Sequence, residues 1–473
     1  MEPISPIMAS NAADWLASAD KAHAAKDFAT AVARYRETID RDPSLFEAWY
    51  GLGCASQSAG DHVSAIDALR HSLALSPHAN GARATLAEAL YSIGYVAESN
   101  REYARLAADP SDPALRRLAL ANVACAAPND PTMDNAAVLV ARKAWFAEVG
   151  QSIAPMPPRG LIAGRKVRIG YLGAFFGSAN WMKGYMGAIA AHDRSAFDVV
   201  LIADRAMPNA EAGYRDHADD QIWDVTGVPN EVLAGHIRRA EIDVLVDLNG
   251  YSFQGRLPLL LYRAAPVQVS WVGMYGTAGT DVSDGTIGDG TVAPSGEERD
   301  FAEPIHRFRS TYLTFDMFYP TPPVAPSPCL AKGYVTFGSF ASAYKLTDTT
   351  IALWARILRA VPDARLSLRN RALDFETNKA DLLRRFNATG VTADRIRLES
   401  GAPHQEFLRC YDQIDIALDA FPYNGGTTTA EAIWQGVPLL TYLGDRWAGR
   451  TSASILRAAG LGAFVADDAD GLV

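Results

Sequence analysis

The run from Asn424 to Thr429 reads Asn-Gly-Gly-Thr-Thr-Thr and carries the residue types best suited to binding an anion. The mostly apolar residues 415–421 before it predict a buried strand, and the residues after it predict a helix. Free main-chain amides and threonine hydroxyls at a helix start can bind a pyrophosphate, whose charge the helix dipole favours. A capped turn without a ligand is the alternative explanation of these residues taken alone.

Three further polar residues stand where strand patterns end or helix patterns begin. Glu431 lies one helical turn inside the predicted helix, where it can accept hydrogen bonds from a ribose or simply favour the helix dipole. Lys345 lies on the loop after a strand pattern at 334–337, and Asn249 begins an Asn-Gly turn after another at 244–248. Ligands of α/β folds bind at the carboxyl ends of strands, which favours a binding function for these positions.

Several classes of protein lose support from the composition. No G-x-G-x-x-G follows the first predicted strand and no G-x-x-x-x-G-K-[ST] occurs, which argues against hydride transfer and ATP hydrolysis. The 473-residue chain has a formal net charge of −10 and no basic block, so we expect no nucleic-acid partner.

The cysteines and the first residues indicate a cytoplasmic protein. Cys54, Cys125, Cys329 and Cys410 are far apart and form no CxxC pair, so we expect no zinc site and no disulfide framework. Residues 1–6 lack a cationic region followed by an apolar one, and no apolar run reaches about 18 residues, so we expect neither secretion nor a membrane span. The chain stops soon after a strand-like pattern at 463–465, as expected of a truncated end.

A 34-residue period links helical patterns near the N-terminus. The aligned pairs are Trp15 and Trp49, Ala19 and Gly53, Asp27 and Asp61, Ala31 and Ala65, Tyr35 and Leu69, Ile39 and Leu73, and Pro43 and Pro77. A third copy contributes Ala87, Gly94, Tyr103 and Pro110. The pattern resembles a tetratricopeptide array of about three repeats, in which small residues recur where helices touch and proline recurs where a helix ends. Such an array either holds a protein segment in its groove or caps a larger domain.

Two sets of strand patterns follow, each bounded by proline-rich segments at 155–165 and 319–328. The predicted strands are 167–172, 199–202, 244–248 and 267–272, then 334–337, 365–368, 396–398, 414–418 and 439–442. Longer helical patterns between several of them are typical of parallel βα units. Residues 111–150 keep a helical pattern without the 34-residue period, so we expect a helical connector there.

The motifs of both halves resemble those of the O-linked N-acetylglucosamine transferase and SPINDLY family. The similarity extends from about residue 166 to the end, and the preceding repeats are also that family's arrangement. The motifs in the first half are Arg168 to Tyr171, Asp247 to Tyr251, Ala265 to Gln268 and Gly276 to Gly279. Those in the second half are Phe337 to Lys345, Trp354, Val361-Pro362, Ala402-Pro403, Asp419 to Gly425, Thr427-Thr428 and Gly436 to Pro438.

The resemblance implies an α-helical tetratricopeptide solenoid followed by a GT-B fold of two Rossmann-like domains. We expect repeats over residues 10–112, a connector over 113–165, an acceptor-side domain over 166–320 and a nucleotide-sugar domain over 332–473. It also implies metal-independent, inverting transfer from a nucleotide-diphosphate sugar, UDP-N-acetylglucosamine or GDP-fucose, to Ser or Thr of a protein held by the repeats. A catalytically weak or inactive nucleotide-sugar-binding scaffold is the alternative.

The resemblance assigns a role to each candidate site residue. Lys345 contacts the diphosphate and offsets the charge that develops on the leaving group, and Asn249 faces the sugar and acceptor. Asp247, which the resemblance does not assign, is a candidate replacement for the absent acid and histidine, and a structural role at the end of a parallel strand is the alternative. The expected donor-binding residues are Tyr344, Ala402, His404, Phe407, Gly425, Gly426, Thr427, Thr428, Glu431, Gly276 and Thr277.

The chain departs from the family pattern at three places. Relatives carry an acid and a histidine after the first strand, whereas this chain reads Ala-Phe-Phe-Gly-Ser-Ala-Asn over 174–180. Gly426 and Phe407 stand where relatives often have histidine, and phenylalanine can stack on a base but cannot donate a hydrogen bond to it. These departures favour the scaffold alternative, while Lys345, Thr427 and Thr428 favour the enzyme.

Overall fold

The computed structural model describes residues 6–109 and 111–473. Pro110, expected to end the third repeat, and Met1 to Ser5, where a targeting segment was not expected, lie outside the described residues. The chain packs into two compact units, residues 1–119 with 338–403 and residues 120–337 with 404–473.

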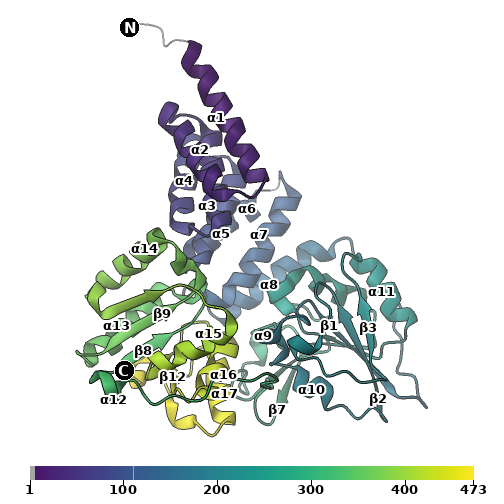
Figure 1. Ribbon diagram of the computed structural model, residues 1–473. Helices are drawn as coiled ribbons and strands as arrows, with labels where there is room; N and C mark the ends of the chain where they lie inside the picture. The colour runs from purple at the N-terminus through teal and green to yellow at the C-terminus, as the bar shows by residue number, and fades with distance from the viewer. Residues whose placement is uncertain (1–5, 110) are drawn as a thin grey trace. The chain divides into compact units, whose positions relative to one another are not determined.

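The N-terminal helices form three consecutive pairs, which confirms the predicted repeats (Figure 1). They are α1 (Pro6–Ala24), α2 (Phe28–Arg41), α3 (Phe46–Ala59), α4 (His62–Leu75), α5 (Asn80–Ser92) and α6 (Val96–Ala108). Asp27 and Asp61, one period apart, each cap the next helix, because their carboxylates accept from the Thr30 and Ser64 N–H groups at 3.2 Å. The aligned Ala31 and Ala65 are both fully buried where helices touch.

Two helices follow the repeats, α7 (Pro113–Ala126) and α8 (Asn135–Gly150), as the aperiodic helical pattern predicted. Among the described residues, no helix combines the length and the apolar character needed to cross a membrane.

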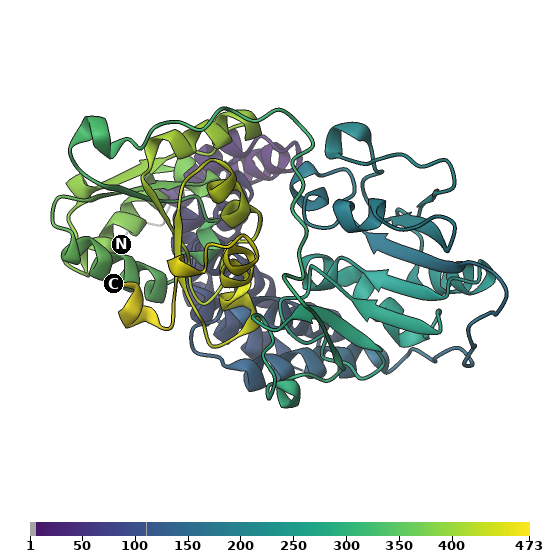
Figure 2. The ribbon, with the colours of Figure 1, turned by 90° about the horizontal axis from the view of Figure 1, so that it is seen from below.

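The first sheet has seven strands in the order β3-β2-β1-β4-β5-β6-β7, with parallel pairing throughout, and Figure 2 shows its strands side by side. The strands are β1 (Val167–Gly173), β2 (Phe197–Ala203), β3 (Gln221–Asp224), β4 (Val244–Asp247), β5 (Val267–Ser270), β6 (Gly285–Asp289) and β7 (Ile305–Phe308). Ile189 of α10 (Met186–Ala190) packs on one face, and Leu233 of α11 (Asn230–Arg239) packs on the other. The short helix α9 (Ala179–Met182) follows β1.

The second sheet has the strand order β10-β9-β8-β11-β12-β13. The strands are β8 (Thr336–Ser339), β9 (Arg365–Arg369), β10 (Ile396–Glu399), β11 (Ile416–Leu418), β12 (Leu439–Tyr442) and β13 (Val465–Ala466). The helices are α12 (Cys329–Lys332), α13 (Asp348–Ala360), α14 (Glu376–Asn387), α15 (His404–Arg409), α16 (Thr427–Trp434), α17 (Thr451–Ala458) and α18 (Ala469–Leu472). The strand order matches the predicted Rossmann-like domain.

The predicted strands are confirmed, with β8 and β11 each starting two residues later than expected, but β3, β6 and β7 were not predicted. β3 and β7 are the edge strands of the first sheet, and most of their residues are exposed or half-buried, so they carry no apolar run. β6 reads Gly-Thr-Ile-Gly-Asp, and two glycines in five residues conceal a strand from any propensity argument.

Candidate functional site

A buried carboxylate, Asp419, helps to hold the turn between β11 and α16. Asp419, 4% exposed, accepts hydrogen bonds from the N–H groups of Ala420 at 3.0 Å and Gly425 at 2.9 Å and from the Thr441 hydroxyl at 2.8 Å. Burial raises the pKa of this carboxyl, and the three donors partly offset the rise. The glycine-threonine segment is therefore fixed to its own sheet.

Position 425 suits glycine, because a side chain there would crowd the turn. A Cβ at position 425 would lie 2.5 Å from the Thr429 hydroxyl oxygen and 2.7 Å from that of Thr428. Gly426 is different, because a Cβ there would meet nothing closer than the Tyr275 hydroxyl at 3.5 Å. A side chain therefore meets close contacts at position 425 but only ordinary van der Waals contacts at position 426, directly before Thr427 begins α16.

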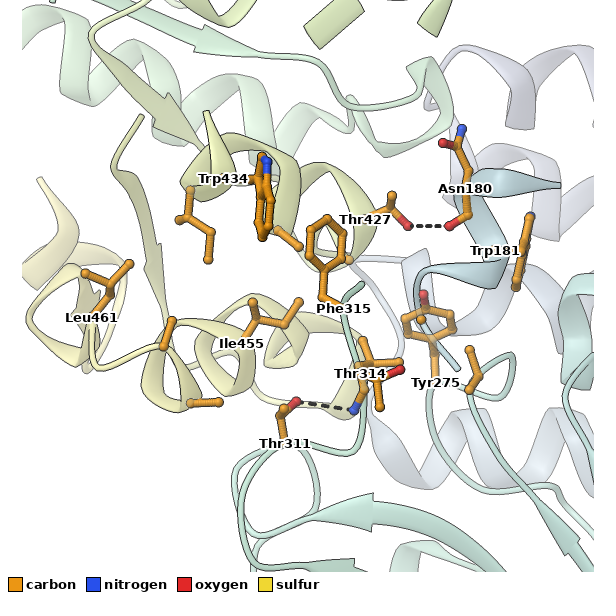
Figure 3. A pocket seen from close by; sticks show the side chains of 18 residues that line it. Asn180, Trp181, Tyr275, Thr311, Thr314, Phe315, Thr427, Trp434, Ile455 and Leu461 are labelled. Atoms are coloured by element: carbon orange, nitrogen blue, oxygen red, sulfur yellow. Dashed lines mark hydrogen bonds between the residues drawn. The ribbon is translucent and has the colours of Figure 1, made fainter. Parts of the chain in front are cut away.

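A cavity of about 620 Å³ opens beside this turn (Figure 3). The aromatic lining comes from Trp181 of α9, Tyr275 of the loop after β5, Phe315 of the segment after β7, and Trp434 of α16. Its polar lining includes Asn180, Thr311, Thr314 and Thr427, and the Thr427 hydroxyl donates to the Asn180 carbonyl oxygen at 3.4 Å. Aromatic rings with nearby hydroxyl and amide groups suit a ligand that has both apolar faces and polar edges.

Glu431 and His404, both expected to bind the donor, meet in a buried cluster around Lys183. The Lys183 ammonium donates to Glu431 Oε1 at 2.7 Å and lies 3.3 Å from His404 Nε2 and 3.3 Å from Asn180 Oδ1. The Tyr319 hydroxyl hydrogen-bonds His404 Nε2. The cluster joins α9 and its following turn to α16 and to the start of α15.

Burial shifts every titrating group of this cluster toward its neutral form. Burial lowers the pKa of Lys183 and raises that of Glu431, and in each case the partner charge opposes the shift. Burial and the neighbouring Lys183 ammonium lower the pKa of His404 to about 4. His404 is therefore neutral near pH 7, and Lys183 with Glu431 is the one ion pair of the cluster.

The β4 end carries Asp247 and Asn249, both buried. The Asp247 carboxylate accepts from the N–H groups of Asn249 at 3.1 Å and Gly250 at 3.0 Å, and burial raises its pKa to about 6. Asn249 Oδ1 accepts from the Ala174 N–H at 2.7 Å, whereas Asn249 Nδ2 is a buried donor without a partner among the described residues. Asp247 thus holds the loop from which Asn249 bridges to β1.

Gly276 and Thr277 belong to a loop with its own buried network. The Thr277 hydroxyl donates to Glu303 at 2.7 Å and accepts from the Gly279 and Ala302 N–H groups at 3.0 Å each. Arg142 of α8 donates to the Thr277 carbonyl oxygen. These contacts stiffen the segment that carries Tyr275 to the cavity.

The Lys345 turn lies in the other unit, where the third repeat pair contacts it. Tyr344 stacks on Tyr91 of α5 with ring centroids 5.3 Å apart and planes at 11°. Gly94, between α5 and α6, has φ +91°, and a Cβ there would lie 2.4 Å from the Leu346 carbonyl oxygen. The backbone between the two repeat helices therefore packs directly against the residue after Lys345.

Arg385 of α14 connects the same two segments. The residue is buried, with an exposed fraction of 6%. Its guanidinium donates to the Ile93 carbonyl oxygen at 3.0 Å and to the Leu346 carbonyl oxygen at 2.6 Å. It also donates to Asp348 at 2.8 Å and lies 4.7 Å from the centre of the Tyr95 ring. We call Tyr91, Gly94 and Arg385 the repeat clamp.

The remaining two donor-side residues are half-buried near α15. Ala402 lies in the loop between β10 and α15, and Phe407 lies within α15. The Phe407 ring is stacked at 6.4 Å from the His404 ring and meets the Tyr411 ring edge-on at 5.9 Å.

Comparison with known proteins identifies the family. The profile of glycosyl transferase family 41 matches residues 154–319 and 328–472. The chain belongs to glycosyl transferase family 41. The match covers both α/β halves and every candidate site residue.

Named relatives agree with this membership. The chain is 31% identical to the probable UDP-N-acetylglucosamine–peptide N-acetylglucosaminyltransferase SPINDLY of Arabidopsis thaliana, over 65% of this chain and 34% of that protein. It is 28% identical to the probable transferase SEC of the same plant, over 63% of this chain and 31% of SEC. The chain therefore spans about a third of the length of these curated relatives.

A solved structure extends the similarity to nearly the whole chain. A mutant of the Thermobaculum terrenum O-GlcNAc transferase aligns with a TM-score of 0.78 and 27% identity, covering 99% of this chain and 89% of that one. The helical repeats and both α/β halves of this family 41 member thus have a counterpart in one solved protein.

The segment after β1, which we expected to depart from the family pattern, contributes to an aromatic stack. Phe175 stacks on Trp181 with ring centroids 4.3 Å apart and planes at 9°, and α9 begins at Ala179. In the segment where the resemblance led us to expect an acid and a histidine, aromatic rings pack together, and one of them, Trp181, lines the cavity.

Sequence reasoning missed Lys183, Tyr319 and the aromatic residues of the cavity. The signal for Lys183 is slight, because it is the one charged residue in the run from Asn180 to Met186 but a lone lysine is usually a solvated surface group. Tyr319 and Trp434 carry no comparable signal, because their positions become informative only once the connector and α16 are placed in space.

Proposed function

We propose that this family 41 member transfers a sugar, N-acetylglucosamine in the first instance, from a nucleoside-diphosphate sugar to Ser or Thr of a protein. One observation carries the proposal: the Gly425 to Thr428 turn, hydrogen-bonded to Asp419 at the start of α16, opens onto an aromatic-lined cavity of about 620 Å³. Family membership, the printed names of the relatives and the O-GlcNAc transferase structure support it.

In this proposal, each part of the donor has its own group of residues. The amides and hydroxyls of Gly425, Gly426, Thr427 and Thr428 bind the diphosphate. Glu431 accepts from the ribose, and Tyr344, Ala402, His404 and Phe407 form the side that takes the nucleoside. The sugar occupies the cavity, and we assign Asn249, Gly276 and Thr277 to the sugar side of the site.

The reaction is a displacement at the anomeric carbon. The acceptor oxygen forms the new bond from one face while the bond from the anomeric carbon to the diphosphate oxygen breaks on the other, which inverts the configuration. The acceptor proton leaves to solvent or to the departing phosphate. Lys345 and the helix amides stabilise the charge gained by the diphosphate, so this stabilisation does not require a metal ion. Asp247 serves this reaction by holding the loop of Asn249, since its oxygens accept main-chain N–H groups.

The repeats hold the acceptor protein in this proposal. Three helix pairs form a regular array, and repeat arrays of this kind commonly bind extended protein segments.

The test combines binding and turnover. We expect UDP and UDP-N-acetylglucosamine to raise the thermal stability of the purified chain, by about 2.7 kcal/mol at a ligand concentration 100 times Kd. Lys345→Ala should remove most transfer to a Ser/Thr peptide and leave the repeats folded by circular dichroism. The exposed Lys143 provides the matched control, Lys143→Ala.

Other outcomes would redirect the proposal. Stabilisation by GDP and GDP-fucose in place of the uridine ligands would change the donor. Binding without transfer or hydrolysis of the sugar would support the scaffold alternative. Normal turnover by Lys345→Ala would remove the assigned role of the lysine.

A further inference from the structure

Lys183 is a buried cation that family resemblance did not assign to any role. It is 0% exposed, and its ammonium donates to Glu431, which lies 248 positions later in the chain and is 2% exposed. The pair therefore joins the first α/β half to the second within one compact unit.

The groups around the pair leave Lys183 one charged partner. His404 Nε2 lies 3.3 Å from the Lys183 ammonium and 3.8 Å from Glu431 Oε1, but this histidine is neutral near pH 7. Asn180 supplies an amide oxygen at 3.3 Å, and the Tyr319 ring lies 5.1 Å from the ammonium. The ammonium donates to Asn180 Oδ1 and to Glu431 Oε1, so it uses one defined oxygen of the carboxylate.

A purely structural ion pair is a weak explanation of this arrangement. Replacing a buried ion pair by apolar residues of similar volume is often neutral or stabilising, so stability alone does not call for charge here. Location favours a function, because the cavity is lined by Asn180, Trp181 and Gly184 around Lys183 and by Thr427 and Ala430 before Glu431.

We propose that Lys183 is a positioning residue that holds Glu431 ionised through Oε1, so that Oε2 accepts hydrogen bonds from the ribose hydroxyls of the donor. The inference rests on the proposed function. Within residues 6–109 and 111–473, the Glu431 carboxylate accepts its hydrogen bond through Oε1. A protonated Glu431 would lose acceptor capacity, and the buried ammonium at 2.7 Å opposes protonation.

The experiment measures ribose recognition separately from diphosphate recognition. Calorimetry gives the affinities of UDP and of 2′,3′-dideoxy-UDP, and of GDP with its dideoxy counterpart, for the full chain. We expect the original chain to prefer the ribose form by about tenfold to a hundredfold, because hydrogen bonds to a charged group are strong. In Lys183→Met that preference should fall to within about twofold, while dideoxy affinity stays unchanged. Lys143→Met is the matched control and should keep the preference.

A second variant keeps the test decisive if Lys183→Met fails to fold. Lys183→Met combined with Glu431→Gln leaves no single buried charge, and it should fold and lack the ribose preference.

Each result bears on a stated claim. A preference retained in folded Lys183→Met, or in the double variant, overturns the role of Lys183 and leaves the proposed function standing. Equal binding of ribose and dideoxy forms by the original chain overturns the contact between Glu431 and the ribose, and this inference with it. An original chain that binds neither nucleotide overturns the proposed function itself.

Discussion

The two turns proposed to bind the diphosphate are held in different ways. The Gly425 to Thr428 turn is fixed from inside its own sheet, by Asp419 at the end of β11 and by Thr441 of β12. The Lys345 turn is fixed from outside its sheet, by the repeat clamp. One turn depends on neighbouring strands, and the other depends on helices about 250 residues earlier in the chain.

This difference indicates which of the two turns a protein bound to the repeats can move. A protein segment that shifts the backbone between α5 and α6 would move the Leu346 carbonyl oxygen, because Gly94 packs against it and Arg385 bonds both segments. The Asp419 contacts lie wholly within the other unit. Repeat occupancy is therefore expected to act on the lysine more than on the glycine-threonine turn.

The largest expected loss of unfolding free energy comes from removing the Asp419 carboxylate that supports the glycine-threonine turn. Asp419→Ala removes the acceptor of two main-chain N–H groups and one hydroxyl, which should lower the free energy of unfolding by about 4 kcal/mol. UDP should no longer stabilise the variant in thermal denaturation. Asp419→Asn keeps an acceptor oxygen and is the control. Full UDP stabilisation of Asp419→Ala would show that the turn needs no internal support.

Asp247 at the end of β4 also accepts main-chain N–H groups, and its pKa predicts a pH dependence of the unfolding free energy. The pKa of Asp247 is raised to about 6, so the folded chain binds a proton that the unfolded chain releases near pH 4. The stabilising contribution is therefore full below about pH 4 and is lost as the pH rises through about 6, a change of about 3 kcal/mol. Denaturant unfolding of the original chain should show this loss relative to Asp247→Asn, and parallel curves for the two chains would contradict it.

Breaking the repeat clamp should have a smaller effect on stability and a selective effect on turnover. Arg385→Leu removes donors from the Ile93 and Leu346 carbonyl oxygens, at a cost of about 2 kcal/mol in unfolding free energy. Transfer should fall about tenfold, as expected for a misplaced catalytic group. Lys379→Leu is the control, since Lys379 lies on the same helix and its ammonium donates to Glu376 of that helix at 2.6 Å. Unchanged turnover in folded Arg385→Leu would make the clamp purely structural.

The smallest effect is expected from the stacked tyrosines. Tyr91→Ala removes the ring that faces Tyr344 at 5.3 Å, which should cost about 1 kcal/mol and reduce turnover by a few fold. Tyr91→Phe keeps the stacked ring and should behave like the original chain. A turnover loss in Tyr91→Phe as large as in Tyr91→Ala would assign the effect to the hydroxyl and not to the stack.

Much of the fold was predictable because its signals are local. The repeat period predicted the helix pairs, and Asp27 and Asp61 occupy capping positions that the period itself marks. Strands β3, β6 and β7 were not predicted because exposed edges and glycines carry no apolar run. The domain boundaries and the roles of the site residues stay predictions, to be decided by the experiments above.

The sequence by itself determined the parts: a helical array of fixed period, two sets of parallel strands, and a glycine-threonine turn at a helix start. Each of these depends on residues close together in the chain, so spacing and residue type suffice to identify it. Only the tertiary structure decided the partners of Lys183 and Arg385, which are 248 and 292 positions away. Those pairings depend on how the sheets and repeats pack, and no local periodicity encodes which distant oxygen a buried cation will reach.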